Sequence, residues 1–255
     1  MPGWVNQLDT TLFPFLADHR VEGTPILPGA AVIEMALAAA RTRYPDASAL
    51  ELRDVELLRP IVFDRGARET QCTLLPDGAW QLASRPRLAD EALALHARAA
   101  VVAAAPDRRQ RLEESGDVRE VVGADTLYRL AAQLGLGYGD SFRTIEEVRL
   151  IDEDCAVVKL RSVSAGQDWL LDPAAVDGAF QGLLALLCQT ASNETGFLPR
   201  RFGRITAIAP FGRAVTHAQL RLTRHGARSV AADIVLYDAA KEAVAALSDC
   251  WFTRV

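Results

Sequence analysis

The sequence predicts an α+β chain built as two similar halves, each with one apolar helix and several antiparallel strands. Two runs, residues 29–43 and 173–187, are apolar on nearly every helical face, so both helices are expected to be buried. Strand-like segments follow each run. A charged segment, residues 106–123, separates the two sets and predicts a linker. With 255 residues and 50% hydrophobic side chains, the chain is long enough for a substantial core.

The composition excludes several classes of function. A formal net charge of −5 gives no electrostatic footprint for nucleic acid. No run of 18 or more apolar residues occurs, so no membrane span is predicted, and no signal peptide, phosphate-binding loop or dinucleotide fingerprint is present. The four cysteines form no zinc-binding cluster. We expect reduced thiols in a cytoplasmic protein, although an even count leaves disulfides open.

The elements of the first half follow from its breakers and periodicity. Pro28 fixes φ just before the helix at 29–43, and Tyr44-Pro45-Asp46 ends it. The strands predicted next cover residues 50–58, 60–63, 69–75 and 79–84, with a hairpin turn at Pro76-Asp77-Gly78. Residues 93–104 are also apolar, but their alanine content leaves helix and strand open.

The second half repeats this organisation without visible sequence repetition. Asp125 and Thr126 predict the cap of a short helix over residues 127–134, and the glycine-rich turn after it presents Tyr138 and Phe142. Asp172 and Pro173 predict the start of the second apolar helix. The remaining strands are expected at residues 143–150, 155–160, 205–208, 218–224, 229–237 and 243–252. One helix wrapped by successive antiparallel strands suggests a hot-dog fold.

His19 is the first residue with a chemical role to consider. It lies between an apolar approach and a loop in which Gly23 permits a turn that a residue with Cβ would resist. The loop ends at a helix start, Pro28-Gly29, whose N–H groups are unpaired. A histidine near such a helix start can act as a base beside a polarised carbonyl. A lone histidine in this setting would more often be an ordinary surface residue.

Asp177 and Gln181 are the second candidate pair. They are four residues apart and therefore share one face of the apolar helix. A carboxylate buried on such a face is unfavourable unless it is paired, and Gln181 can donate to it. The pair alone would equally fit a capped helix with a satisfied polar contact.

The spacing His19-x3-Gly23-x4-Pro28 resembles a catalytic signature of dehydratase domains of modular polyketide synthases. The pair Asp177-x3-Gln181 resembles the second signature of the same family, which is Asp-x3-Gln or Asp-x3-His. The family usually has His-Pro ahead of this motif, whereas this chain has Asp172-Pro173, a change that can alter the charge of the pocket.

Two weaker matches extend the resemblance over nearly the whole chain. Residues 138–142 resemble a Tyr-Gly-Pro-x-Phe motif, with Asp140 where the family usually has proline. Leu198-Pro199 resembles a Leu-Pro segment of these domains. Arg200 and Arg201, next in sequence, could face an acidic carrier or its phosphopantetheine phosphate, although solvent exposure is the simpler reading.

The resemblance implies a double hot-dog fold, with residues 1–105 as the first half, 106–123 as a linker and 124–255 as the second half of one integral domain. It implies a lyase that dehydrates a 3-hydroxyacyl thioester on an acyl carrier protein. His19 would be the base, Asp177 the acid and Gln181 the residue that orients Asp177, while Tyr138 assists or lines the acyl tunnel. The substrate-binding residues would be Gly23, Pro28, Gly29, Phe142, Leu198 and Pro199, with backbone N–H groups near Gly29 for the thioester carbonyl.

No metal or redox cofactor is implied, because elimination of water is acid–base chemistry. The implied partners are the acyl carrier protein and neighbouring polyketide synthase domains, with a homodimer as an option and neither nucleic acid nor membrane. We expect the chain to be one domain of a larger protein. Three alternatives remain open at this point: an enoyl isomerase that shifts the double bond, a pyran-forming cyclase, and a catalytically silent structural domain.

Overall fold

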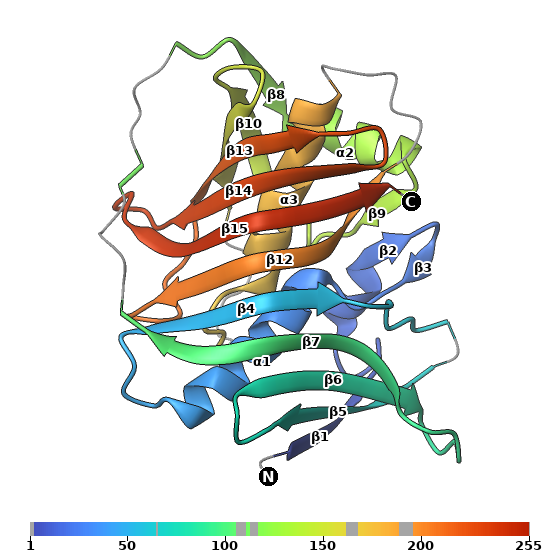
Figure 1. The fold of residues 1–255 in the computed structure, drawn as a ribbon. Coiled ribbons are helices and arrows are strands. Elements are labelled where there is room, and N and C mark those ends of the chain that lie inside the picture. The colour runs from blue at the N-terminus through green and yellow to red at the C-terminus, as the bar shows by residue number, and fades with distance from the viewer. Residues whose placement is uncertain are drawn as a thin grey trace.

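The computed structural model describes residues 3–64, 66–105, 111–112, 117–161, 168–188 and 196–254. Within these residues, 12 strands form one antiparallel sheet that runs through both halves of the chain (Figure 1). The two long helices lie behind this sheet in the view of Figure 1. The predicted α+β class is therefore confirmed, and the helix-on-sheet arrangement of each half matches a double hot-dog fold.

The first half of the sheet has the strand order β1-β5-β6-β7-β4. Its strands are β1 (Gly3–Leu8), β4 (Ala49–Leu57), β5 (Arg68–Leu74), β6 (Ala79–Pro86) and β7 (Ala94–Ala104). Helix α1 (Gly29–Arg43) packs against β4 and β7. Small side chains such as Ala36 and Ala40, both fully buried, let its backbone lie close to the sheet. The predicted helix at 29–43 is confirmed.

The second half has the order β12-β15-β14-β13-β11-β10-β8. Its strands are β8 (Glu120–Gly123), β10 (Ile145–Leu150), β11 (Cys155–Leu160), β12 (Phe197–Ile208), β13 (His217–His225), β14 (Ser229–Tyr237) and β15 (Ala243–Arg254). Helix α3 (Pro173–Leu187) packs on β10, β11 and β13, and every one of its residues is buried. Among the residues described, no helix is long and apolar enough to cross a membrane.

Strands β4 and β12 join the two halves. They pair antiparallel, with Ile205 opposite Leu52 and Ile208 opposite Ala49. Behind them α1 and α3 contact each other, so a single hydrophobic core extends across the junction. Residues far apart in sequence therefore keep a fixed relative position through the backbone ladder of one sheet.

A small second sheet lies next to the helix start of α1. It contains β2 (His19–Val21), β3 (Thr24–Pro25) and β9 (Leu136–Tyr138), and it joins the first half of the chain to the second. The turn between β2 and β3 passes through Gly23, whose φ of +75° lies in the left-handed region. The predicted need for glycine at this position is confirmed.

Several predicted elements differ from the structure. Residues 60–63 form no named strand; Val62 makes an isolated bridge to Ile26 instead, because the segment crosses to the loop before α1. The strand expected at 205–208 is the end of β12, which begins at Phe197. Residues 93–104, left open between helix and strand, contain β7, which begins at Ala94. Helix α2 (Ala124–Gln133) starts three residues before the expected 127, with Gly123 rather than Asp125 or Thr126 at its cap and no side-chain cap bond.

The predicted linker, residues 106–123, is described only in part, since 106–110 and 113–116 lie outside the described residues. Glu120–Gly123 form β8 and pair with β10 at the edge of the sheet. Leu112 is 7% exposed and packs with Tyr237 and Ala243. Leu112 and β8 thus pack against elements of the second half.

Candidate active site

His19 is held at the start of β2 by backbone pairing and by aromatic packing. It lies opposite Tyr138 of β9, and its carbonyl accepts a hydrogen bond from the Ile26 N–H at 3.0 Å. The imidazole is buried, with its centroid 5.7 Å from the Tyr138 ring and 5.3 Å from the Phe142 ring, both edge-on. These contacts fix the plane of the imidazole and leave Nε2 directed at the second half.

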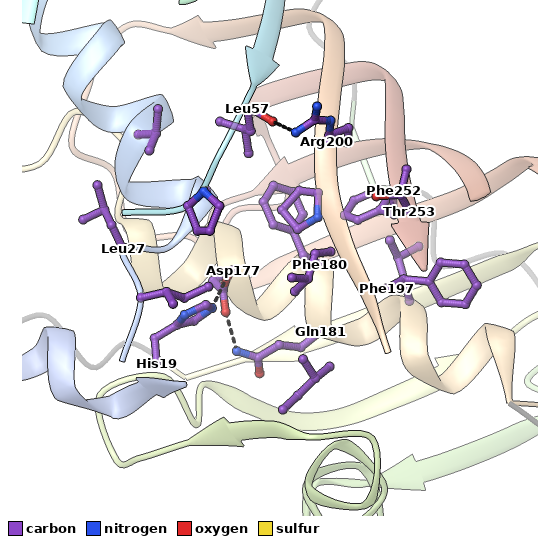
Figure 2. A pocket seen from close by; sticks show the side chains of 18 of the residues that line it. His19, Leu27, Leu57, Asp177, Phe180, Gln181, Phe197, Arg200, Phe252 and Thr253 are labelled. Carbon is purple, nitrogen blue, oxygen red and sulfur yellow. Dashed lines mark hydrogen bonds and ion pairs between the residues drawn. The ribbon is translucent and has the colours of Figure 1, made fainter. Parts of the chain in front are cut away.

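Asp177 faces His19 from the first turns of α3. Its Oδ1 lies 3.5 Å from His19 Nε2, and its side chain is buried (Figure 2). The Gln181 amide, one turn further on, donates through Nε2 to Asp177 Oδ2 at 2.7 Å and to the Phe142 carbonyl at 3.0 Å. The predicted meeting of His19, Asp177 and Gln181, from two halves of the chain, is confirmed.

The three side chains open onto one cavity of about 300 Å³ between the halves. The rest of its wall is mostly apolar. Its members include Leu27 before α1, Val32 of α1, Leu57 of β4, Phe180 and Leu184 of α3, and Phe197 and Leu198 of β12. A mostly apolar cavity in which the His19 imidazole and the Asp177 carboxyl group face each other suits a hydrocarbon chain that loses a proton from one carbon while a substituent of the neighbouring carbon gains one. Within the described residues, no group of three His, Cys, Asp or Glu side chains could hold a metal ion.

Tyr138 also lines the cavity. Burial raises the pKa of its hydroxyl well above the ordinary value of 10, and the nearby Asp177 carboxyl adds to the rise. The phenol therefore keeps its proton throughout the physiological range and is available as a hydrogen-bond donor.

Comparison with known protein families shows to which family this chain belongs. A family model described as "Polyketide synthase dehydratase N-terminal domain" matches residues 103–255, and one described as "Polyketide synthase dehydratase domain" matches residues 2–85. The chain belongs to the polyketide synthase dehydratase family. Dehydratases of this family are lyases that remove water from 3-hydroxyacyl thioesters during polyketide elongation.

Individual relatives agree with this assignment. The chain is 33% identical over 247 residues to polyketide synthase ThaG of Burkholderia thailandensis, a match that covers 90% of this chain and 4% of the relative. It is 28% identical over 215 residues to polyketide synthase PksM of Bacillus subtilis, covering 77% of this chain and 5% of the relative. The chain thus spans only about one twentieth of the length of these relatives, which are multidomain synthases.

Solved structures show the same fold. A trans-AT polyketide synthase dehydratase domain from Brevibacillus brevis superposes with a TM-score of 0.89 at 22% identity, covering 99% of this chain and 93% of that one. The dehydratase domain from the CurJ module of the curacin synthase gives a TM-score of 0.87 at 24% identity, covering 99% and 91%. These domains are double hot-dog folds, which confirms the predicted fold class.

The predicted substrate-binding residues of the dehydratase fall into two groups. Gly29, Leu198 and Pro199 line the cavity. Gly23, Pro28 and Phe142 are not part of its wall: Gly23 forms the β2–β3 turn, and Phe142 packs behind His19. Pro28 is the N-cap residue of α1 and has no N–H, so the backbone donors expected near Gly29 are those of the first residues of α1.

Several wall residues were not identified from the sequence. Phe180 and Leu184 follow Asp177 at helical spacings of three and seven, so the same periodicity that paired Asp177 with Gln181 could have found them. His96 lines the cavity from β7, and no local pattern pointed to it. Both its ring nitrogens are engaged, with the Ser84 hydroxyl at 2.8 Å and the Arg59 carbonyl at 3.2 Å. Burial lowers its pKa, so His96 stays neutral.

Asp172 is not among the residues that line the cavity. It caps α3 as predicted, accepting the Ala174 N–H at 2.9 Å. Its charge acts instead on Glu34, a buried residue of α1 that accepts the N–H groups of Leu170 and Leu171 at 2.8 and 2.9 Å. Glu34 thus ties α1 to the segment that leads into α3.

The raised pKa of the buried Glu34 carboxyl predicts that the stability of the protein depends on pH. Burial, chiefly, and the charge of Asp172 raise its pKa from 4.5 to about 7, despite the two N–H groups that favour the carboxylate. Between these values the folded protein binds more protons than the unfolded chain. The contribution of Glu34 is therefore fully present below pH 4.5 and is lost as pH rises through about 7.

We expect Glu34→Gln to change how the free energy of unfolding varies with pH, because the glutamine amide cannot ionise. From pH 5 to pH 8 the free energy of unfolding of the variant, relative to the parent, should rise by up to about 3 kcal/mol. Chemical denaturation at four or five pH values measures it. Glu153→Gln, at an exposed loop position, controls for the loss of one carboxylate, and equal slopes for both variants would contradict the assignment.

Proposed function

We propose that this domain dehydrates a 3-hydroxyacyl chain carried as a thioester on an acyl carrier protein, with His19 and Asp177 as the proton-transfer pair. The observation that carries the proposal is their placement: an imidazole and a carboxyl group 3.5 Å apart, buried at one apolar cavity. The family assignment supports the reaction class, and the geometry supports the roles of the residues.

In the proposed reaction, neutral His19 removes a proton from C2, which the thioester carbonyl acidifies. The electron pair of the C2–H bond becomes the C2–C3 double bond as the C3–O bond breaks. Protonated Asp177 gives its proton to the departing hydroxyl, which leaves as water. Gln181 holds the Asp177 carboxyl through one oxygen, which leaves the other directed at His19 and the substrate.

The carbonyl oxygen gains negative charge while C2 loses its proton. The first turn of α1 begins at Gly29 on the cavity wall. Ala31 and Val32 donate to the Pro28 carbonyl, whereas the N–H groups of Gly29 and Ala30 have no acceptor within the helix. We propose that these groups bind the carbonyl oxygen, and that the Tyr138 hydroxyl assists by donation inside the cavity. The proposed reaction uses no cofactor, because proton transfers between these residues and the substrate accompany the cleavage of the C3–O bond.

The acyl carrier partner is supported by two guanidinium groups on the cavity wall, those of Arg59 and Arg200. Both side chains are exposed, and Arg200 Nη1 is held by the carbonyls of Leu57 and Leu58 at 2.6 and 2.7 Å. Cations at the rim suit a phosphodiester such as that of phosphopantetheine.

We also propose that residues 1–105 and 124–255 are halves of one integral domain that acts in the cytoplasm.

Arg59→Ala should weaken binding of phosphorylated substrates only. The KM for a 3-hydroxyacyl phosphopantetheine should rise ~5- to 20-fold, in keeping with one charge-assisted contact, while the KM for the matching acyl pantetheine, which lacks the phosphate, should not change. Arg98→Ala, at a guanidinium that pairs with Glu56 away from the cavity, serves as the control. An equal rise in KM for both substrates would remove Arg59 from the phosphate site.

The proposed function is tested by incubating the domain with a 3-hydroxyacyl carrier protein in D₂O. We expect loss of one water and a 2,3-alkene as the first product. Deuterium at C4 or a 3,4-alkene would show additional double-bond migration. No water loss from the hydroxyacyl substrate, together with conversion of a supplied 2,3-alkene, would replace the dehydratase with an isomerase.

A further inference from the structure

The loop at residues 139–142 touches both members of the proton-transfer pair. The Phe142 ring packs edge-on against the His19 imidazole, with 5.3 Å between centroids. The Phe142 carbonyl accepts the Gln181 amide at 3.0 Å, and the same amide nitrogen holds Asp177. The position of this one residue therefore affects the base directly and the acid through Gln181.

Asp18, the residue before His19, holds this loop at two points. Its carbonyl accepts the Gly139 N–H at 2.8 Å, and its carboxylate Oδ2 accepts the Ser141 N–H at 3.0 Å. The loop closes on itself through the Phe142 N–H, which donates to the Gly139 carbonyl at 3.0 Å. A Cβ on residue 139 would overlap the Asp18 carboxylate, so glycine is required for this close contact.

The Asp18 carboxylate acts here as a hydrogen-bond acceptor. Within the described part of the chain, no Lys, Arg or His lies within ion-pair distance of it, and it is absent from the cavity wall. An oxygen at this position that accepts the Ser141 N–H is therefore what the loop needs. Asparagine can supply such an oxygen and alanine cannot.

We propose that Asp18 is a positioning residue for dehydration: by fixing the loop at 139–142, it sets the distance between His19 Nε2 and the Asp177 carboxyl. The inference rests on the proposed roles of His19 and Asp177. Without the Ser141 contact, the loop keeps only the backbone bond between the Gly139 N–H and the Asp18 carbonyl. Its segment around Ser141 and Phe142 is then free to shift, and Phe142 no longer holds the imidazole and Gln181 in one arrangement. The substrate cavity itself keeps its wall.

The first test compares Asp18→Ala with Asp18→Asn. A displacement of about 1 Å in a catalytic group can lower turnover ~100-fold, so we expect kcat of Asp18→Ala to fall ~10- to 100-fold with KM within about twofold of the parent. Asp18→Asn should stay within about threefold of the parent kcat, because its amide oxygen still accepts the Ser141 N–H. Circular dichroism and thermal unfolding establish that each variant is folded.

A double-mutant cycle with Gln181→Ala tests the route of the effect. If Asp18 acts through the loop and Gln181, the combined loss in kcat should be clearly smaller than the product of the two single losses. A kcat loss in the double variant equal to the product of the two single losses would overturn the proposal. A kcat of Asp18→Ala equal to that of the parent, or a tenfold loss of kcat in Asp18→Asn, would also overturn it. If Asp18→Ala does not fold, Gly139→Ala displaces the same loop and must show the same fall in kcat at unchanged KM.

The outcomes separate this inference from the proposed function. A parent protein that releases no water from a 3-hydroxyacyl carrier substrate refutes the function. A parent that dehydrates, with an inactive His19→Ala variant and an unaffected Asp18→Ala variant, retains the function and refutes the positioning role alone.

Discussion

Replacement of His19 by alanine or of Asp177 by asparagine should each reduce dehydration ~10²- to 10⁴-fold, the usual contribution of one general acid or base. His19→Ala removes the group that accepts the C2 proton. Asp177→Asn is isosteric, and its amide oxygen can still accept the Gln181 Nε2–H, so the helix contact survives while the acidic proton is lost. Single-turnover assays with a 3-hydroxyacyl carrier substrate measure both losses.

The losses in turnover of the two variants should not multiply when both substitutions are combined in one protein, because base and acid act in the same step. Thermal unfolding of each variant checks that the loss is chemical, since both side chains are buried. Glu153→Gln, far from the cavity wall in an exposed loop, is expected to turn over like the parent. Near-normal turnover by folded Asp177→Asn would remove Asp177 as the acid.

Replacement of Gly178 by alanine should destabilise the protein and disable the site together. Alanine gains about 1 kcal/mol over glycine in a helix interior. At Gly178, however, the new Cβ would overlap Thr144 Oγ1 and lie 2.9 Å from Leu160 Cδ2. Overpacking of this kind costs about 1–3 kcal/mol. The overlap therefore outweighs the gain in helix propensity, and the net effect is destabilising.

Relief of that overlap requires α3 to move away from β10 and β11, and Asp177 is the neighbouring residue. We therefore expect Gly178→Ala to lose about 1–2 kcal/mol of unfolding free energy and ~10- to 100-fold in kcat. Gly3→Ala in β1 is the control, because a Cβ there would make only an ordinary contact of 3.6 Å with the Cys72 carbonyl. A stable and active Gly178→Ala protein would show that α3 tolerates the shift.

The sequence predicted the parts of the site that depend on local pattern. Helix α3 and its cap at Asp172 follow from an apolar run with a good N-cap, and the shared face of Asp177 and Gln181 follows from helical spacing. The motif resemblance brought His19 to the same site. Residues 93–104 could not be assigned from the sequence, because alanine fits both helix and strand. Only the pairing of β7 with β4 and β6 makes this segment a strand.

The contacts that sequence reasoning missed join distant segments. Glu34 meets Leu170 across 136 positions, and Asp18 meets Ser141 across 123. Neither contact leaves a local signature, because an acidic residue in an apolar helix or before a motif histidine has the same appearance with or without its partner.

The pairing of β4 with β12 has a mechanical consequence. The two strands pair from Arg201 opposite Glu56 to Ile208 opposite Ala49, so parting the halves would break a continuous backbone ladder. His19 on β2 and Asp177 on α3 lie outside this ladder, but the ladder joins the two halves of the chain that carry them. We expect a long acyl chain to enter and leave by rearrangement of side chains at the cavity rim, such as Phe197 and Arg200, while the spacing of the reacting groups stays constant through every turnover.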